Sequence, residues 1–279
     1  YGLSARGIEV PPSMGVMSFL DRIRSLLATS TPHDQDALNE ALRLLAVWRS
    51  DLIANTIVKL NGPTVQSGPF SGMNFVAHMA EGCLAPKLLG TYESELQPFI
   101  EAWTVHVFDA IINIGCAEGY YAVGLARRMP HSRIHAYDTD DAAQTICQKL
   151  AEANGVDHRF EIGGIFRGQD FARFEGQRCL VVCDIEGSEL QVLDPELFPA
   201  LRKMDVLVEC YDSPQLGAIS VELARRFEPT HDVIHVTSKL PAVSLPDWLT
   251  QRVELDQLLA VWEGRGAPNP WLVLHAPPD

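Results

Sequence analysis

The chain is poor in positive charge. Of its 279 residues, 22 are Lys or Arg and 36 are Asp or Glu, so the formal net charge at pH 7 is -14. A protein with this charge repels the phosphate backbone of nucleic acids and the surface of an anionic membrane. The sequence therefore predicts neither a nucleic-acid partner nor a membrane partner.

The sequence also lacks the cysteine spacings of zinc sites and of CxxC redox motifs. Four of the six cysteines lie in apolar runs, where thiols pack as small hydrophobic groups. The six are Cys83, Cys116, Cys147, Cys179, Cys183 and Cys210. We expect them to be reduced, which predicts a cytoplasmic location.

Long hydrophobic runs are missing as well. No apolar stretch approaches the ~18 residues of a membrane span. The first residues, "YGLSARGIEVPPSM", have neither the basic start nor the apolar middle of a secretory signal. Hydrophobic residues nevertheless make up 47% of the chain, which is enough for a full core.

Helical spacing dominates the chain from residue 18 to about residue 60. Its apolar stripe Leu38, Leu42, Leu45 and Trp48 favours a core position, and a long exposed seam would instead allow a homodimer. The loop "LNGPTVQSGPFSGMNF" follows, with too much Gly and Pro for a regular element. Within it, Phe70 and Met73 either contact a substrate or pack on the core.

Beyond residue 101 short apolar runs alternate with helical stretches, which predicts a doubly wound (Rossmann-like) α/β fold. The runs are Val107 to Ile114, Arg133 to Tyr137, Arg159 to Ile162, Cys179 to Cys183, Asp205 to Val208, Val233 to Val236 and Trp271 to His275. The helical candidates are Tyr120 to Met129, Ala142 to Asn154, Pro195 to Lys203, Ile219 to Phe227 and Glu254 to Glu263. We expect a seven-stranded, mostly parallel sheet with an N-terminal helical extension. Residues 1–104 form the extension and a substrate-side loop, and residues 105–279 the ligand-binding domain.

The stretch "INIGCAEGYYAVGLARRMP" has the form of a first strand, a turn and a helix, the usual ligand cradle of such sheets. A dinucleotide fingerprint would need Gly at positions 117 and 120, where the chain has Ala117 and Tyr120, and a P-loop is missing too. Gly115 and Gly119 let backbone amides approach a ligand, and the following helix directs its positive end toward it.

An acidic residue, Asp138, ends the second strand 19 residues after Gly119. A carboxylate in this place accepts hydrogen bonds from both hydroxyls of a ribose. The ligand therefore contains a ribose but no pyrophosphate, which fits S-adenosylmethionine (SAM).

With these motifs the chain resembles the class I SAM-dependent methyltransferases, and most closely their FkbM-like group. The first motif of the family corresponds to "NIGCAEG", the acidic end of the second strand to "AYDTD", and the D-x-E-G motif to "DIEG". Asn113 stands in place of the usual acid and Ala117 in place of a glycine. The predicted cofactor-binding residues are Tyr92, Glu93, Asn113, Gly115, Cys116, Ala117, Gly119, Tyr120, Asp138, Thr139 and Asp184.

Two of these residues, Tyr92 and Glu93, precede the first strand. One interpretation is that they close over the methionine end of SAM, whose ammonium needs an acceptor. The other is that Thr91 caps a helix here and Glu93 complements its dipole.

Methyl transfer from SAM mainly requires alignment of a nucleophile, and a hydroxyl nucleophile also has to lose its proton. Asp184 follows the apolar run "CLVVC" and should lie beside the reactive methyl. Other acids and a histidine end neighbouring strands. The candidate bases are Asp184, Glu186, Glu209, Asp212 and His235. This acidic set favours O-methylation.

Metal binding is a less favoured use of the same acids. Asp184 with Glu209 or Asp212 offers oxygen ligands that suit Mg²⁺, so the sequence predicts no metal but leaves this alternative. The resemblance implies a small-molecule substrate, such as a sugar or a polyketide-like or other secondary metabolite. A SAM- or nucleoside-binding module without catalysis is the second hypothesis, and an enzyme that uses a nicotinamide cofactor is the third.

Overall fold

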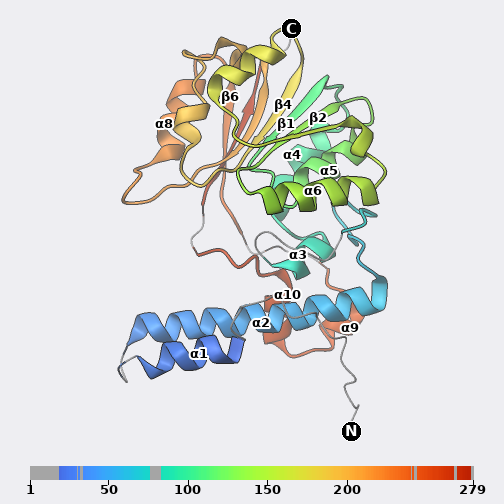
Figure 1. Cartoon of the computed structure of the whole chain (residues 1–279), viewed down its shortest axis with the longest axis vertical. Coiled ribbons are helices and arrows are strands. Elements are labelled where there is room, and N and C mark those ends of the chain that lie inside the picture. Colours follow the sequence, from blue (N-terminus) through green and yellow to red (C-terminus); the bar gives the residue numbers. More distant parts are fainter. Residues whose placement is uncertain are drawn as a thin grey trace. The chain divides into compact units, whose positions relative to one another are not determined.

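The computed structural model describes residues 19–29, 31, 34–75, 83–239, 241, 244–266 and 269–277. By compactness the chain divides into two units, residues 1–49 and 50–279. Figure 1 labels the elements in chain order. All six cysteines lie in described segments, and each is buried.

The first unit contains helix α1 (Phe19–Ala28) and the first half of α2 (Gln35–Asn61). Asp34 caps α2, because its Oδ1 accepts a hydrogen bond from the Ala37 N–H at 3.0 Å. The predicted core position of the apolar stripe is wrong. Its side chains are exposed, at 54% for Leu38, 66% for Leu42, 48% for Leu45 and 43% for Trp48.

The second unit contains a seven-stranded sheet, as predicted, with the strand order β3-β2-β1-β4-β5-β7-β6. All neighbours pair in parallel except β7, which is antiparallel to both β5 and β6. The strands are β1 (Ala110–Ile114), β2 (Arg133–Tyr137), β3 (Phe160–Gly163), β4 (Cys179–Cys183), β5 (Asp205–Glu209), β6 (Asp232–Val236) and β7 (Trp271–His275). The order reverses between β1 and β4, which is where ligands bind in doubly wound sheets.

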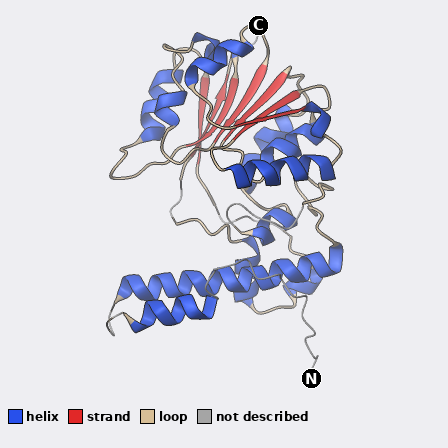
Figure 2. Ribbon diagram, in the orientation of Figure 1, coloured by secondary structure: helices blue, strands red, loops and turns tan. Residues whose placement is uncertain are grey.

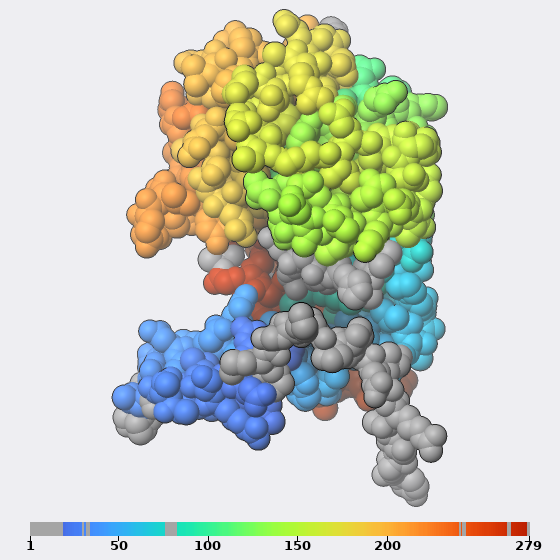
Figure 3. All heavy atoms as spheres, viewed as in Figure 1, coloured from blue at the N-terminus to red at the C-terminus, as the bar shows by residue number. Residues whose placement is uncertain are grey.

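Two apolar layers cover the sheet, because successive side chains of a strand point to opposite faces. Ile111 and Val182 belong to the layer with the helices α4, α5 and α6, and Ile112 and Val181 to the layer with η3, η4 and α8. Figure 2 shows the strands between these helices. In the space-filling view, segments from α6 to η4, coloured green to yellow, cover much of one face (Figure 3).

The helices of the second unit begin with the end of α2. The others are α3 (Leu84–Leu89), α4 (Gln97–Trp103), α5 (Tyr120–Arg128), α6 (Asp141–Ala153), α7 (Glu189–Val192), α8 (Ile219–Phe227), α9 (Asp247–Thr250) and α10 (Glu254–Val261). Short 3₁₀ segments are η1 (Ser94–Leu96), η2 (Asp157–Arg159), η3 (Gly168–Phe174) and η4 (Pro199–Lys203). The helix predicted from Pro195 is thus only a 3₁₀ segment from Pro199. Before it, the Asp194 carboxylate accepts the backbone N–H groups of Glu196 and Leu197 and holds that stretch in a turn.

The Gly- and Pro-rich loop before residue 76 packs on the core through Phe70 and Met73. Phe70 is 3% exposed and Met73 is fully buried. The Phe70 ring packs edge-to-face on Tyr120 and Tyr121. Gly124 of α5 makes room for it, because a Cβ there would lie 2.5 Å from the ring. The apolar surfaces of Phe70 and Met73 are therefore buried in the core.

The compact units divide the chain at residues 49 and 50, whereas the sequence suggested a division at 104 and 105. Residues 50–104 join the sheet unit because Ile57, Phe70 and Trp103 pack into its core. Of the predicted extension, residues 1–18, 30, 32–33 and 76–82 lie outside the described residues. The division by function stays a prediction. Among the described helices, none is both long and apolar enough to span a membrane.

Candidate active site

The turn between β1 and α5 rests on the end of β2. The N–H groups of Gly115 and Cys116 both donate to the Tyr137 carbonyl, at 2.8 and 2.9 Å. The Ala117 N–H donates to Asp138 Oδ2 at 2.8 Å, and Asp138 Oδ1 accepts the Asp140 N–H at 2.9 Å. Asp138 therefore fixes the turn.

Gly115 is required by the neighbouring strand. It has a φ of 77°, and a Cβ on it would lie 1.6 Å from the carbonyl oxygen of Asp184. We expected this glycine to leave space for a ligand, but the end of β4 takes that space. No other residue type fits this contact without moving β4.

Ala117 also has a left-handed backbone, with a φ of 45°. A residue with a Cβ pays about 1–2 kcal/mol for this conformation. The hydrogen bond from its N–H to Asp138 helps to hold it there.

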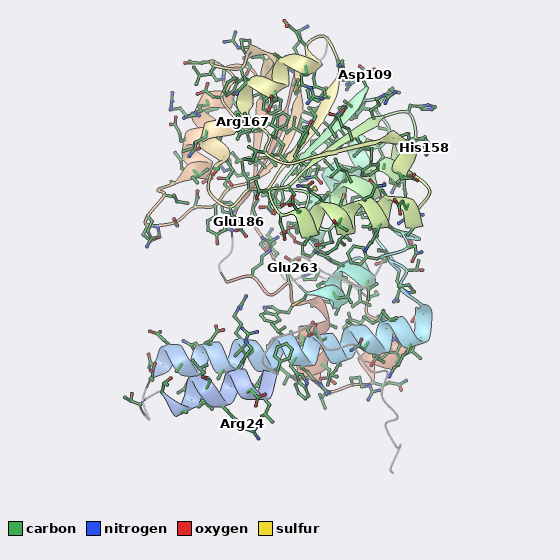
Figure 4. All side chains as sticks on the ribbon, in the orientation of Figure 1. Arg24, Asp109, His158, Arg167, Glu186 and Glu263 are labelled. Atoms are coloured by element: carbon green, nitrogen blue, oxygen red, sulfur yellow. The ribbon has the colours of Figure 1, made fainter. Side chains whose placement is uncertain are left out.

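A cavity of about 740 Å³ lies at the carboxyl edge of the sheet, around the ends of β1, β2, β3 and β4. Four predicted site residues with side chains line it, namely Asp138, Thr139, Asp184 and Glu186. Residues that the sequence analysis did not name complete the wall. They are the apolar Ile165 and Phe166 and the polar Arg167, Gln169, Ser188 and Gln191. Figure 4 labels Glu186 at this edge of the sheet and Asp109 at the opposite edge.

A second cavity, of only about 30 Å³, lies on the other side of the turn. Gly115 and Asp184 line both cavities. The predicted residues Tyr92, Asn113, Cys116, Ala117 and Tyr120 line the small one, together with Lys87, Glu118, Tyr121 and Val182. Gly119 lies outside both: it precedes α5 and packs against Cys147.

Asn113 of the small cavity has a buried side-chain amide that is only partly hydrogen-bonded among the described residues. It is 2% exposed, and its Nδ2 donates to the Val182 carbonyl over 3.4 Å. Its Oδ1 is buried and has no hydrogen-bond partner in the described part of the chain. An unsatisfied buried acceptor costs about 1–3 kcal/mol, so this atom suits a ligand with a donor group.

Glu93 lies in a buried ion cluster. It is 1% exposed and has a φ of 46°, and its carboxylate accepts hydrogen bonds from the Tyr121 hydroxyl and from Arg265. Arg265 also pairs with Glu209 and Glu263. Thr91 does not cap a helix here, because its hydroxyl lies 3.4 Å from the Pro86 carbonyl and Glu93 precedes η1. Glu93 thus pairs with Arg265 in the segment before β7, and it does not border either cavity.

Burial raises the pKa of Glu93 to about 8 from its ordinary value of 4.5, although Arg265 acts in the opposite direction. The loss of solvation in the interior outweighs the attraction of a cation that is shared among three carboxylates. Glu93 therefore gains a proton on folding at neutral pH.

Three of the candidate bases have other partners or positions. The Asp212 carboxylate accepts the N–H and the hydroxyl of Ser220, at the start of α8. Glu209 pairs with Arg265. His235 is exposed on the edge strand β6, three strands from β4, or roughly 14 Å at the usual strand spacing. Only Asp184 and Glu186 of the candidate bases line the large cavity.

The donor set for Mg²⁺ is not assembled in the described segments. Glu209 and Asp212, the expected partners of Asp184, are engaged by Arg265 and Ser220. No three His, Cys, Asp or Glu side chains of the described residues converge as metal ligands. These residues do not fit the ion, and no step is assigned to it.

The sequence analysis missed two charged residues, Lys87 beside the small cavity and Arg265 in the ion cluster of Glu93. Lys87 is the only charge in the apolar segment "LAPKLL", and such a residue is buried only with a partner. Arg265 lies in "EGRGAPNPWLVLH", the stretch that ends in β7. Two of its three partners, Glu209 and Glu93, are 56 and 172 residues away along the chain, so spacing could not identify them.

Comparison with known proteins gives structural neighbours only. No protein-family model matches the sequence, and no curated protein matches it either. The O-methyltransferase TomG of Streptomyces achromogenes, solved with SAM, is 14% identical, with a TM-score of 0.43 and coverage of 82% of this chain and 90% of that one. An O-methyltransferase of Bacillus cereus, solved with S-adenosylhomocysteine (SAH), is 11% identical, with a TM-score of 0.44 and coverage of 92% and 97%.

A protein of Clostridium thermocellum described as an rRNA methylase is 13% identical, with a TM-score of 0.44. The match covers 66% of this chain and 97% of that chain. The function proposed below rests on the site of this chain itself.

The raised pKa of Glu93 predicts a specific pH dependence of stability. Because the folded state keeps the proton up to about pH 8 and the unfolded state releases it near pH 4.5, stability falls as the pH rises between these values. Relative to Glu93→Gln, the unfolding free energy of the wild type should decrease by up to about 1.4 kcal/mol per pH unit in this window. Urea unfolding at several pH values measures the difference.

The exposed Glu254→Gln variant is the matched control and should follow the wild type. Parallel pH curves for the wild type and Glu93→Gln would contradict the prediction.

Proposed function

We propose that the chain is a SAM-dependent methyltransferase. One observation carries the proposal: the two cavities on either side of the β1–α5 turn meet at Gly115 and Asp184, and each offers an acceptor of a different kind. The large one contains the Asp138 carboxylate, and the small one the unpaired Oδ1 of Asn113. A ligand with a nucleoside at one end and an ammonium at the other satisfies both.

SAM has these two ends, and it supplies a methyl group already activated by a positively charged sulfur. Asp138 would accept the ribose hydroxyls, and Ile165 and Phe166 would give apolar contact to the adenine. Asn113 Oδ1 would accept a hydrogen bond from the ammonium. A nicotinamide dinucleotide would instead need a cradle for its pyrophosphate, and the turn has Ala117 and Tyr120 where that cradle needs glycines.

Asp184 is the residue best placed to act on a methyl acceptor. It follows β4 next to the turn and lines both cavities, so a group bound where they meet lies beside it. A carboxylate in this place orients a hydroxyl and takes its proton as the new bond to carbon forms, which favours O-methylation of a small molecule. Glu186 borders only the large cavity and is the second candidate.

The "DIEG" motif supports the closer assignment to the FkbM-like group. Glu186 has a φ of 51° and Gly187 a φ of 110°, so the chain turns sharply two residues after Asp184. The buried Glu189 accepts the Gly187 N–H at 2.8 Å and holds this turn. Because of this turn, Asp184 and Glu186 both line the large cavity.

A SAM- or nucleoside-binding module without catalysis is the second candidate function. It is favoured by the pairing of Glu209 and Asp212 with other residues, which leaves Asp184 and Glu186 as the only candidate bases in the large cavity. Incubation with methyl-labelled SAM and a panel of hydroxylated small molecules separates the two functions. Binding of SAM without any transfer would support the module.

A homodimer through the N-terminal helices and a cytoplasmic location complete the proposal. The exposed stripe of α2 offers the dimer surface. Sedimentation velocity should therefore give a dimer for the wild type and a monomer for Leu42→Glu/Leu45→Glu, since two buried carboxylates would oppose association. Asn39→Glu, also exposed on α2, is the control. A wild-type monomer at every concentration would contradict the dimer.

The ribose contact predicts that Asp138→Asn weakens the binding of both SAM and SAH roughly 10- to 150-fold, the range of hydrogen bonds to charged groups. Calorimetry measures the affinities, and thermal unfolding checks that the turn still folds. Asp141→Asn, exposed at the start of α6, should bind normally. A clear binding heat with NAD and none with either SAM species would refute the cofactor.

Asp184→Asn should lower methyl transfer far more than it lowers SAM affinity, because a group that acts on the acceptor stabilises the transition state more than the bound cofactor. We expect single-turnover transfer to slow ~10²- to 10⁴-fold and SAM affinity to change less than about threefold. Glu186→Gln is the comparison variant. Equal transfer by Asp184→Asn and wild type would remove Asp184 from the reaction.

A further inference from the structure

Lys87 is a buried lysine beside the proposed cofactor site. It belongs to the short helix α3, and its side chain is 3% exposed. Its ammonium pairs with the carboxylate of Glu118, which is 1% exposed, and lies 4.7 Å from the centre of the Tyr92 ring. Both charges have thus lost their water.

Such a pair adds little to stability. Removing two charges from water costs several kcal/mol per ion, and well-packed apolar residues in their place are often as stable or more stable. Lys87 and Glu118 also come from distant segments, since Glu118 belongs to the turn after β1. The position of the pair therefore suggests a role in binding rather than in folding.

The pair lines the small cavity, next to the unpaired Oδ1 of Asn113. An α-amino acid group carries an ammonium and a carboxylate a few ångströms apart. The carboxylate of Glu118 and the ammonium of Lys87 offer the complementary charges. We propose that Lys87 and Glu118 form a clamp for the zwitterionic amino-acid end of the cofactor, Lys87 binding its carboxylate and Glu118, with Asn113, binding its ammonium.

The clamp keeps every buried charge compensated. When the ligand enters, the Lys87–Glu118 contact is exchanged for two contacts of the same kind, so that neither ion is left alone. A lysine ammonium has three donors, and Asn113 Oδ1, which has no partner among the described residues, gains a hydrogen bond from the ligand. The cavity of about 30 Å³ holds little more than water, so the ligand end enters as the Lys87 side chain swings away from Glu118.

This inference rests on the proposed function and names the residues that bind the amino-acid end of the cofactor. It predicts that the protein distinguishes nucleosides by their tails. SAH should bind at least about tenfold more tightly than 5′-methylthioadenosine, which has the same nucleoside and sulfur but no amino-acid group. SAM should also bind more tightly than its decarboxylated analogue, which retains the ammonium, by a similar factor.

The first experiment is calorimetry of the wild-type chain with these four ligands. The second compares wild type with Lys87→Met/Glu118→Gln, which removes both charges at nearly constant volume. We expect the affinity of the double variant for SAH to fall about 10- to 100-fold and its affinity for 5′-methylthioadenosine to change less than threefold. Lys149→Met, exposed on α6, is the control and should bind both ligands normally.

A merely structural pair would weaken both ligands equally, which would overturn the clamp. An unchanged ratio of the two affinities in the folded double variant would also overturn it. If the double variant does not fold, the comparison of SAM with its decarboxylated analogue on the wild type decides, and equal affinities would refute the clamp. Wild-type protein that binds none of the four ligands would refute the proposed function itself.

Discussion

The contact of Gly115 with the carbonyl of Asp184 is the constraint on which the rest of the site depends. It brings the ends of β1 and β4 together where the strand order reverses, closer than any side chain would allow. The two cavities therefore meet at these two residues. A small change of distance here would move the acid on β4, the turn before α5 and the cavities at once.

Buried charge is the second theme of the site. Lys87 with Glu118, and Arg265 with Glu209 and Glu263, hold charged groups inside a protein that is acidic overall. Such groups are costly to bury and are tolerated only because each has a counter-charge. Lys87 and Glu118 join α3 to the β1–α5 turn, and Arg265 joins the segment before β7 to β5 and to Glu93.

Much of the fold was predictable from the sequence because it depends on local pattern. Each of the seven apolar runs became a strand, with β2, β4 and β7 matching to the residue. The site was only partly predictable. Asp138 and Asp184 were found because strand ends have a known place in such sheets, whereas Arg265 and Lys87 act through contacts between distant segments. The stripe of α2 was misjudged because periodicity identifies an apolar face without saying what covers it.

The Arg265 cluster has a consequence for the order in which the molecule is made. Glu93 leaves the ribosome 172 residues before Arg265, and β7, which pairs with both β5 and β6, is the last strand to be synthesised. Until then β5 and β6 have no strand between them, and Glu93 lacks its contact with Arg265. The earlier strands can pair during translation, but this corner of the sheet closes only when the segment from Arg265 to β7 has emerged.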